Sequence, residues 1–248
     1  MHQVSRPLAV APIDVSALSP AAQRRLLEEK GYLSLSGVYD VAEIEILWER
    51  FARLLDGSAD VPESYILELA TGKGSGGGRK DYDTMQVNWI DRVVPDLLES
   101  SVLRRTQRLA ESLLGGPARL NFGSLINKSP AVASVTPWHQ DAAYDEPELL
   151  QPGAPGALGF WIPLVPTGID NGCLCYAEGS HRGGLRPHAR LPGEHSLVAS
   201  LDEESELFVA CPVPLGGVAL HHRMTLHCAL PNRSSQPRPV LTINFITT

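Results

Sequence analysis

The second half of the chain is a succession of short runs rich in β-branched and aromatic residues, separated by glycine, proline and asparagine. Such runs are typical of β-strands. No helix-length pattern lies between them, so they favour a sandwich or a barrel, and a jelly roll fits a segment of this size. The pair Asn171-Gly172 also predicts a hairpin turn. The predicted strands cover residues 120–126, 157–164, 172–177, 207–213, 218–222 and 240–246.

The first half of the chain carries helix patterns. Ser19 followed by Pro20 is a good helix start, and Gly31 is a good stop. Asp40 and Glu43 form a capping-box pattern that begins a second helix, and a third is expected over residues 101–114. The fold class is therefore mainly β with supporting α-helices. The 248 residues are expected to form one domain, 1–248, with helical support mainly over 19–116 and the barrel mainly over 119–247.

A glycine-rich segment lies between the second and third predicted helices, over residues 71–80. Gly72, Gly74 and Gly77 formally fit the G-x-G-x-x-G pattern of dinucleotide-binding proteins. No strand pattern precedes them and no helix pattern follows, so the context that this motif requires is missing. A surface loop is the expected structure.

Charge and composition limit the classes of partner. The formal net charge of −7 argues against nucleic acid, whose binding depends on clustered lysine and arginine. No apolar stretch approaches the roughly 18 residues of a membrane-spanning helix, and the N-terminus has no signal-peptide pattern. The four cysteines lack paired C-x-x-C spacing, so reduced, buried thiols are expected. These features predict a cytoplasmic protein with neither nucleic acid nor membrane as a partner.

The segment Trp138-His139-Gln140-Asp141 offers two metal-ligating side chains. In an extended segment residues i and i+2 point to the same side, so His139 and Asp141 can converge on one ion. An H-x-D sequence also occurs by chance, as a surface histidine beside a solvated acid. The pair makes half of a metal site at most.

Three later histidines, His221, His222 and His227, can supply a third ligand. Two imidazoles and one carboxylate form the facial triad of non-haem Fe(II) oxygenases. Arg238 follows His227 by eleven residues and begins a predicted strand, where a buried guanidinium suits the carboxylate of a dicarboxylate co-substrate. His222 and Arg233 share this spacing, so spacing alone leaves the choice open. Arg233 lies in a polar, turn-like stretch and is expected to be exposed.

Four groups of residues, in this order along the chain, make the sequence resemble the phytanoyl-CoA dioxygenase family of Fe(II)- and 2-oxoglutarate-dependent oxygenases. The groups are Leu125-Ile126-Asn127-Lys128 with Pro130; Trp138-His139-Gln140-Asp141 with Tyr144; Asp170-Asn171-Gly172-Cys173-Leu174 with Gly179-Ser180-His181 and Leu185-Arg186-Pro187-His188; and His227 with Asn232, Ser234 and Arg238. The combination covers the second half of the chain and is far more specific than H-x-D alone.

The resemblance implies a double-stranded β-helix, which is a cupin-like jelly-roll barrel. It implies that His139, Asp141 and His227 bind Fe(II) and that Arg238 pairs with the far carboxylate of 2-oxoglutarate, with O2 as the second co-substrate. Gln140, Trp161 and Lys128 match positions of the co-substrate site, although Trp161 also suits the barrel core and Lys128 a solvated loop. At Ala229 some relatives have a serine that hydrogen-bonds the co-substrate, and its loss would cost about 1 kcal/mol.

The implied activity is hydroxylation, or another oxidation, of an unactivated C–H bond in a small molecule, with release of succinate and CO2. A biosynthetic or natural-product intermediate is the expected substrate, and Tyr144, Arg186 and His188 are candidate substrate contacts. An acyl-CoA is the alternative suggested by the family name, but basic residues for its phosphates are few. A zinc hydrolase could use the same ligands without needing Arg238. A jelly-roll binding module would need none of them.

Overall fold

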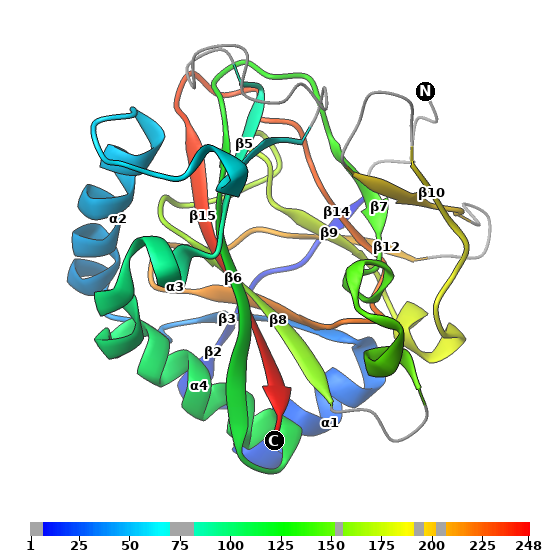
Figure 1. The fold of residues 1–248 in the computed structure, drawn as a ribbon. Helices are drawn as coiled ribbons and strands as arrows, with labels where there is room; N and C mark the ends of the chain where they lie inside the picture. Colours follow the sequence, from blue (N-terminus) through cyan, green and yellow to red (C-terminus); the bar gives the residue numbers. More distant parts are fainter. Residues whose placement is uncertain (1–6, 70–81, 152–155, 191–195, 202–206) are drawn as a thin grey trace.

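Two β-sheets face each other in the computed structural model, which describes residues 7–69, 82–151, 156–190, 196–201 and 207–248 (Figure 1). The larger sheet has the strand order β2-β3-β13-β8-β15-β6-β5-β4. Its strands are β2 (Ile13–Asp14), β3 (Tyr32–Ser36), β4 (Ile66–Glu68), β5 (Thr84–Asn88), β6 (Ala118–Lys128), β8 (Ala157–Pro163), β13 (Val218–His222) and β15 (Arg238–Thr247). The long strand β15 lies between β6 and β8 and is antiparallel to both.

The smaller sheet has the order β1-β12-β9-β14-β7. Its strands are β1 (Leu8–Ala9), β7 (Thr136–His139), β9 (Leu174–Ala177), β12 (Phe208–Cys211) and β14 (His227–Ala229), and a separate antiparallel pair consists of β10 (His188–Arg190) and β11 (Leu197–Ala199). The predicted fold class, a mainly β jelly roll of the double-stranded β-helix type, is confirmed. Its two sheets share no strand and stay open, so they do not close into one continuous barrel.

In the described part of the chain four α-helices support the larger sheet on the side away from the smaller one (Figure 1). They are α1 (Pro20–Lys30), α2 (Val41–Leu55), α3 (Ile90–Val93) and α4 (Ser101–Leu114), and short 3-10 helices lie at Val15–Ala17, Glu63–Tyr65, Pro95–Glu99, Asp141–Tyr144, Pro147–Leu150 and Ser180–Gly183. The Ser19 and Asp40 side chains accept backbone N–H groups as cap residues, and Gly31 ends α1 in the left-handed region. The reciprocal half of the predicted capping box is not formed, since the Glu43 carboxylate lies 3.9 Å from Arg105 Nη2 instead.

Alternation along β15 divides the core into two layers. Leu241, Ile243 and Phe245 belong to the large apolar cluster between the sheet and the helices. Val240 lies on the opposite face and packs with Trp161 of β8 in the cluster between the two sheets. The two faces of this strand therefore pack against different layers, and side chains on the Val240 face point into the space between the sheets.

The hairpin prediction at Asn171-Gly172 is wrong. The strands on either side, β8 and β9, lie in different sheets, so this turn carries the chain from one sheet to the other. Asn171 instead forms an isolated bridge with Asn232. Gly172 has φ +90°, and a Cβ there would lie 2.8 Å from the Leu230 carbonyl oxygen, so close approach to the chain near Leu230 explains the glycine.

Three further expectations concern the glycine-rich segment, the cysteines and membrane-spanning helices. The glycine-rich segment 71–80 lies outside the described residues. All four cysteines are buried free thiols, as expected. Among the helices of the described residues, none is both long and apolar enough to cross a membrane.

Candidate metal centre

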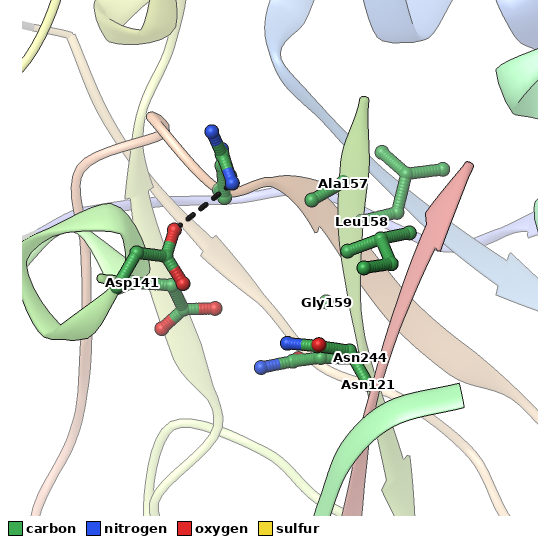
Figure 2. A pocket seen from close by; sticks show the side chains of 9 residues that line it. Asn121, Asp141, Ala157, Leu158, Gly159 and Asn244 are labelled. Atoms are coloured by element: carbon green, nitrogen blue, oxygen red, sulfur yellow. Dashed lines mark ion pairs between the residues drawn. The ribbon is translucent and has the colours of Figure 1, made fainter. Parts of the chain in front are cut away.

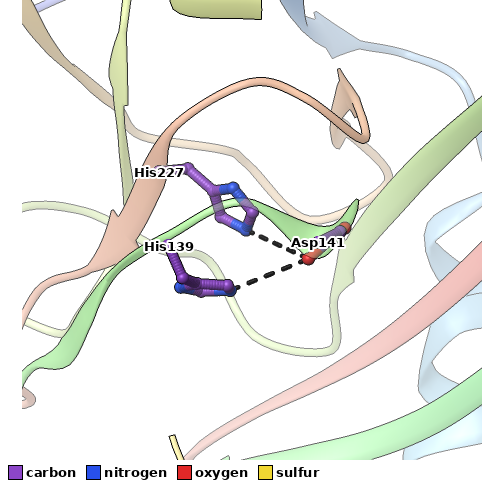
Figure 3. A group of neighbouring side chains, drawn as sticks. All are labelled: His139, Asp141 and His227. Carbon is purple, nitrogen blue, oxygen red and sulfur yellow. Dashed lines mark ion pairs between the residues drawn. The ribbon is translucent and has the colours of Figure 1, made fainter. Parts of the chain in front are cut away.

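Adjacent strands of the smaller sheet bring three metal-ligating side chains together. His139 ends β7, Asp141 follows it in a 3-10 turn, and His227 of β14 pairs directly with His139 across the sheet. Asp141 Oδ1 lies 3.7 Å from His139 Nε2 and 3.6 Å from His227 Nε2, and the three ligand atoms all lie within 4.8 Å of one another (Figure 3). The cluster is a compact set of two imidazoles and one carboxylate, which can hold a metal ion.

The backbone orients both imidazoles. His139 Nδ1 lies 2.7 Å from the Pro137 carbonyl oxygen, and His227 Nδ1 lies 2.9 Å from that of Thr225. A carbonyl oxygen only accepts, so each Nδ1 carries the proton and donates. Each imidazole is therefore the Nδ1–H tautomer, and its Nε2 carries a free lone pair on the side that faces Asp141. This is the tautomer that metal coordination through Nε2 requires.

Burial and neighbouring charges give the three groups the protonation states of ligands. Burial lowers the pKa of His227 well below 6.5, and the nearby His221 and His139 lower it further. Burial also lowers the pKa of His139. For Asp141 burial opposes ionisation, but the attraction of His227 and a hydrogen bond from His221 outweigh it, so the pKa of this carboxyl lies below its usual value. Neutral imidazoles and a carboxylate are expected at neutral pH.

His221 supports the carboxylate from behind. Its Nε2 lies 3.1 Å from Asp141 Oδ2, the oxygen that does not face the other two ligand atoms, and its Nδ1 lies 3.0 Å from the Tyr176 hydroxyl. His222 turns elsewhere, with its Nδ1 accepting the Met224 N–H. Of the three later histidines, only His227 lies in the ligand cluster, and the interpretation of His221 and His222 as supporting or core residues agrees with their contacts.

Gly159 of β8 makes room for this arrangement. A Cβ at position 159 would lie 2.8 Å from His221 Nε2, 3.0 Å from Asp141 Oδ2 and 3.2 Å from Asn244 Oδ1. Sequence reasoning did not identify Gly159 or Tyr176. A glycine between Leu158 and Phe160 in a buried strand is a signal for a close approach of this kind, whereas no local pattern marks Tyr176.

Replacing Gly159 with alanine is expected to weaken metal binding about 10- to 100-fold, the range seen when groups that orient a ligand are disturbed. The new methyl group would displace the Asp141 and His221 side chains, both of which it meets at 3.0 Å or less. Gly168→Ala is the matched control, because a Cβ at position 168 meets nothing within 4 Å. Titration of metal-free protein with Fe(II) under anaerobic conditions measures the effect, and equal affinities for the two variants would contradict it.

A second buried cluster lies in the space between the sheets, where Arg238 of β15 pairs in register with Lys128 of β6. Arg238 is 1% exposed, and its Nε and Nη1 have no hydrogen-bond partner. Its guanidinium carbon lies 5.2 Å from the ring centre of Trp161. Burial lowers the pKa of Arg238 only to about 10, so the group stays charged at neutral pH. A buried guanidinium with unused donors is a site for an anion.

Lys128 is fully buried rather than solvated. Its ammonium donates to the carbonyl oxygens of Ser134, Ala229 and Leu230, at 2.9 to 3.2 Å. Burial, followed by the charge of Arg238, lowers the pKa of Lys128 well below 10.5. Within the described part of the chain neither cation has an acidic partner, so a bound anion would relieve both. Arg233, the alternative to Arg238, is exposed as expected.

Gln140 connects the ligand strand to neighbouring loops. Its side-chain amide donates to the Gly184 and Met224 carbonyl oxygens and accepts the Arg186 N–H. These three hydrogen bonds hold Gln140, which lies between the ligands His139 and Asp141, against the loops at residues 184–186 and at Met224. A role for Gln140 in the co-substrate site stays a prediction.

The three candidate substrate contacts lie around this loop. The Tyr144 ring lies 5.9 Å from that of His139, and its hydroxyl accepts the Leu197 N–H at 2.8 Å. Arg186 Nη1 donates to the Ser200 carbonyl oxygen. His188 Nε2 accepts the Gln140 N–H, and its Nδ1 lies 2.8 Å from the Arg186 carbonyl oxygen. Tyr144 thus lies beside a ligand histidine, whereas Arg186 and His188 contact Gln140, the residue between His139 and Asp141.

The metal-free protein is expected to lose stability as the pH falls below 6.5. Burial lowers the pKa of His222 from 6.5 to about 4, and burial lowers the pKa values of His139 and His227 as well. Between the folded and unfolded pKa values the unfolded chain binds more protons, so the free energy of unfolding rises with pH through this window. His222 alone accounts for a loss of about 2 kcal/mol between about pH 7.5 and about pH 5.

Urea denaturation of wild-type and His222→Gln protein at these two pH values tests this expectation. The variant should lose about 2 kcal/mol less than wild type on acidification, because the neutral glutamine does not titrate. Equal losses in the two proteins would contradict the assignment to His222.

Comparison with known proteins gives a consistent result. The family model described as Phytanoyl-CoA dioxygenase (PhyH) matches residues 27–240. The chain is 29% identical to a protein of Stutzerimonas stutzeri named a probable alpha-ketoglutarate-dependent hypophosphite dioxygenase, over 91% of this chain and 78% of the relative. It is 31% identical to the 1-deoxypentalenic acid 11-beta-hydroxylase of Streptomyces exfoliatus, over 53% of this chain and 49% of the relative.

The structure is similar to that of EvdO2 from Micromonospora carbonacea var. aurantiaca complexed with 2-oxoglutarate. The TM-score is 0.74 and the sequences are 28% identical, over 91% of this chain and 89% of EvdO2. Alignments to several curated relatives span less than half of their length, including 42% of one and 49% of the Streptomyces exfoliatus protein.

Proposed function

The chain belongs to the phytanoyl-CoA dioxygenase (PhyH) family of Fe(II)- and 2-oxoglutarate-dependent oxygenases, and on that premise we propose that it hydroxylates, or otherwise oxidises, an unactivated C–H bond of a small molecule. The observation that carries the proposal is the pairing of the two clusters. A His-Asp-His set for a metal lies beside Tyr176, a buried, unpaired guanidinium for a carboxylate lies beside Trp161, and these two rings belong to one cluster between the sheets. A dicarboxylate co-substrate would bind the metal at one end and the Arg238 guanidinium at the other.

His139, Asp141 and His227 would hold Fe(II), and Arg238 would bind the far carboxylate of 2-oxoglutarate. The donor set fits: two imidazoles with Nε2 lone pairs facing one carboxylate are ligands that iron accepts, and three protein ligands leave positions for other molecules. The buried Nε and Nη1 of Arg238 supply hydrogen bonds that no described side chain takes up. Trp161 borders this guanidinium and would help to exclude water.

With iron, 2-oxoglutarate and O2 bound, the centre supplies an oxidant strong enough for an unactivated C–H bond. The atoms balance when O2 places one oxygen in succinate and one in the hydroxylated product, with loss of CO2 from 2-oxoglutarate. The residues of this chain bind and orient: His221 holds the Asp141 carboxylate in place, and Lys128 fixes the strand end at Ala229 and Leu230. Their role is placement within a dry site.

A biosynthetic intermediate is the substrate class we favour. The 1-deoxypentalenic acid hydroxylase among the relatives acts on a small carboxylic acid rather than on a thioester, by its name. An acyl-CoA substrate would need cationic groups for its phosphates, and the two most buried cations face the space between the sheets instead. A zinc hydrolase would leave Arg238 and Lys128 buried without an anion, which is costly.

Co-substrate turnover tests the proposal. Purified protein with Fe(II), 2-oxoglutarate and O2 should release succinate, slowly when alone and faster with a substrate, and chelation of the iron should stop the release. Incubation of the zinc-loaded protein with ester and amide substrates is the complementary assay. Hydrolysis with zinc and no succinate with iron would contradict the proposal.

A further inference from the structure

A continuous set of aromatic rings leads from the ligand His227 across the space between the sheets. Tyr176 lies on β9 of the smaller sheet, and its ring centre is 6.0 Å from that of His227. It stacks on Tyr32, which lies on β3 of the larger sheet, with ring centres 4.5 Å apart and 10° between the ring planes. Rings whose centres are about 4.5 to 7 Å apart are in contact, so the three rings form an unbroken series.

Each tyrosine hydroxyl in this series has a base for its proton. His221 Nε2 lies 3.1 Å from Asp141 Oδ2, a carboxylate oxygen that only accepts, so this nitrogen carries the proton and Nδ1 has the lone pair. The Tyr176 hydroxyl, 3.0 Å from Nδ1, therefore donates to it. The Tyr32 hydroxyl donates to Glu178 Oε2 at 3.0 Å. A phenol gives up an electron readily only when its proton can leave at the same time, and both tyrosines meet this condition.

The series begins in the core and ends at the surface. Tyr176 is 0% exposed and Tyr32 is 3% exposed. Glu178, the partner of Tyr32, also pairs with Lys30 at 3.1 Å, and the side chains of this ion pair are 27% and 34% exposed. A route of contacting groups thus connects a buried metal ligand with the solvent.

Two other neighbours of the ligand cluster do not offer such a route. The hollow behind Asp141 and Gly159 has no tyrosine, tryptophan, cysteine or methionine among its described lining residues (Figure 2). Tyr144 does contact His139, with ring centres 5.9 Å apart. Its hydroxyl meets the Leu197 N–H, however, and this donor cannot take up a proton. The tyrosine pair beyond His227 is therefore the better path for electrons.

An oxidant strong enough for an unactivated C–H bond also attacks the protein when it forms with no substrate in reach, and an oxygenase has to suppress such side reactions. Resting on the proposed oxygenase function, we propose that Tyr176 and Tyr32 form an electron relay that reduces the oxidant of the iron centre when no substrate is bound. The relay protects the metal site, which is a function separate from substrate oxidation.

Each passage through the relay moves one electron. The oxidant takes an electron from Tyr176, whose phenolic proton moves to His221. Tyr176 then regains an electron from Tyr32 and its proton from His221, while the proton of Tyr32 moves to Glu178. A one-electron reductant in solution, such as ascorbate, restores Tyr32, and the proton returns from Glu178. Two passages supply two electrons, which with two protons from the solvent restore Fe(II) and convert the oxygen atom of O2 that is not in succinate into water.

Electron paramagnetic resonance of freeze-quenched samples tests this inference. Protein loaded with Fe(II) and 2-oxoglutarate is mixed with O2 in the absence of substrate. Wild-type protein should show a tyrosyl radical, whose signal narrows when the protein contains ring-deuterated tyrosine, and Tyr176→Phe should lose it. Tyr32→Phe should keep a radical, now confined to Tyr176, that ascorbate no longer removes rapidly. This second variant leaves the hydrogen bond to His221 intact, so it tests the relay without disturbing the support of Asp141.

Tyr39→Phe is the matched control for both variants. Tyr39 is also a buried tyrosine with a hydrogen-bonded hydroxyl, but it lies in the core between the larger sheet and the helices and should not alter the signal. Mass spectrometry of the intact protein measures the protective effect separately. After turnover with ascorbate and no substrate, Tyr176→Phe should carry more added oxygen atoms than wild type, and Tyr39→Phe should match wild type.

A tyrosyl radical that persists in Tyr176→Phe, or equal oxygen addition to Tyr176→Phe and wild type, would overturn the inference. Succinate release and the anaerobic absorption of the Fe(II)–2-oxoglutarate complex, recorded on the same preparations, separate the two claims. If both are present while the substitution has no effect, only the relay fails. If neither is present in wild type, the proposed function fails as well.

Discussion

Replacing His227 with alanine is expected to reduce iron-dependent succinate release to the level of the metal-free protein. The loss should be on the order of 10³-fold or more, because partners that only support a ligand are already worth about 10- to 100-fold. His227 Nε2 is one of three ligand atoms around one point, and the remaining two, from His139 and Asp141, belong to a single short segment. Two ligands are a poor site for Fe(II).

His222→Ala is the matched control for this substitution. His222 is also a partly buried histidine of the same region, but its Nδ1 is engaged by the Met224 N–H and it lies outside the ligand cluster. The control should retain iron binding within a few-fold, measured by anaerobic titration, with circular dichroism as the test of folding. Iron binding by folded His227→Ala protein, or loss of iron binding in the His222→Ala protein, would show that His227 is not the third ligand.

Replacing Arg238 with methionine is expected to raise the dissociation constant for 2-oxoglutarate by about 30- to 1,000-fold. A guanidinium that donates two charge-assisted hydrogen bonds to a carboxylate contributes about 2 to 4 kcal/mol relative to an apolar side chain. Lysine at this position should recover only part of the loss, because its single ammonium does not match the two carboxylate oxygens.

The same substitution should not destabilise the protein in the absence of co-substrate. Arg238 is buried with Nε and Nη1 unsatisfied and lies next to the buried cation of Lys128, so the native state carries the cost of an unpaired charge. Urea denaturation should show an equal or higher free energy of unfolding for Arg238→Met. Arg233→Met, at an exposed position with the same spacing from a histidine, is the control for binding. Unchanged 2-oxoglutarate affinity in Arg238→Met would contradict the assignment.

Elements with strong local signals could be predicted from the sequence. The predicted helix over 101–114 is α4 (Ser101–Leu114), and the predicted strand over 218–222 is β13 (Val218–His222). In β15 the apolar residues Leu241, Ile243 and Phe245 alternate with residues of the other face, because the two faces pack against different layers.

Features that depend on distant contacts could not be predicted. The strands that carry the ligand histidines, β7 and β14, have four and three residues, too few for a periodic signal. The direction of the chain after Asn171 depends on which sheet receives β9, and a turn motif does not encode that. Spacing alone left His222 open beside His227 as the third ligand, and it is the strand pairing that places His227 opposite His139.

The central claim is that one space between the sheets binds iron and 2-oxoglutarate together. Anaerobic addition of Fe(II) and 2-oxoglutarate to metal-free protein, followed by visible absorption spectroscopy, tests it without any knowledge of the substrate. We predict a charge-transfer band that requires both additions, is absent in His227→Ala and needs far more 2-oxoglutarate in Arg238→Met. A folded wild-type protein that gives no band, while binding zinc tightly, would contradict the account and favour a hydrolase or a binding module.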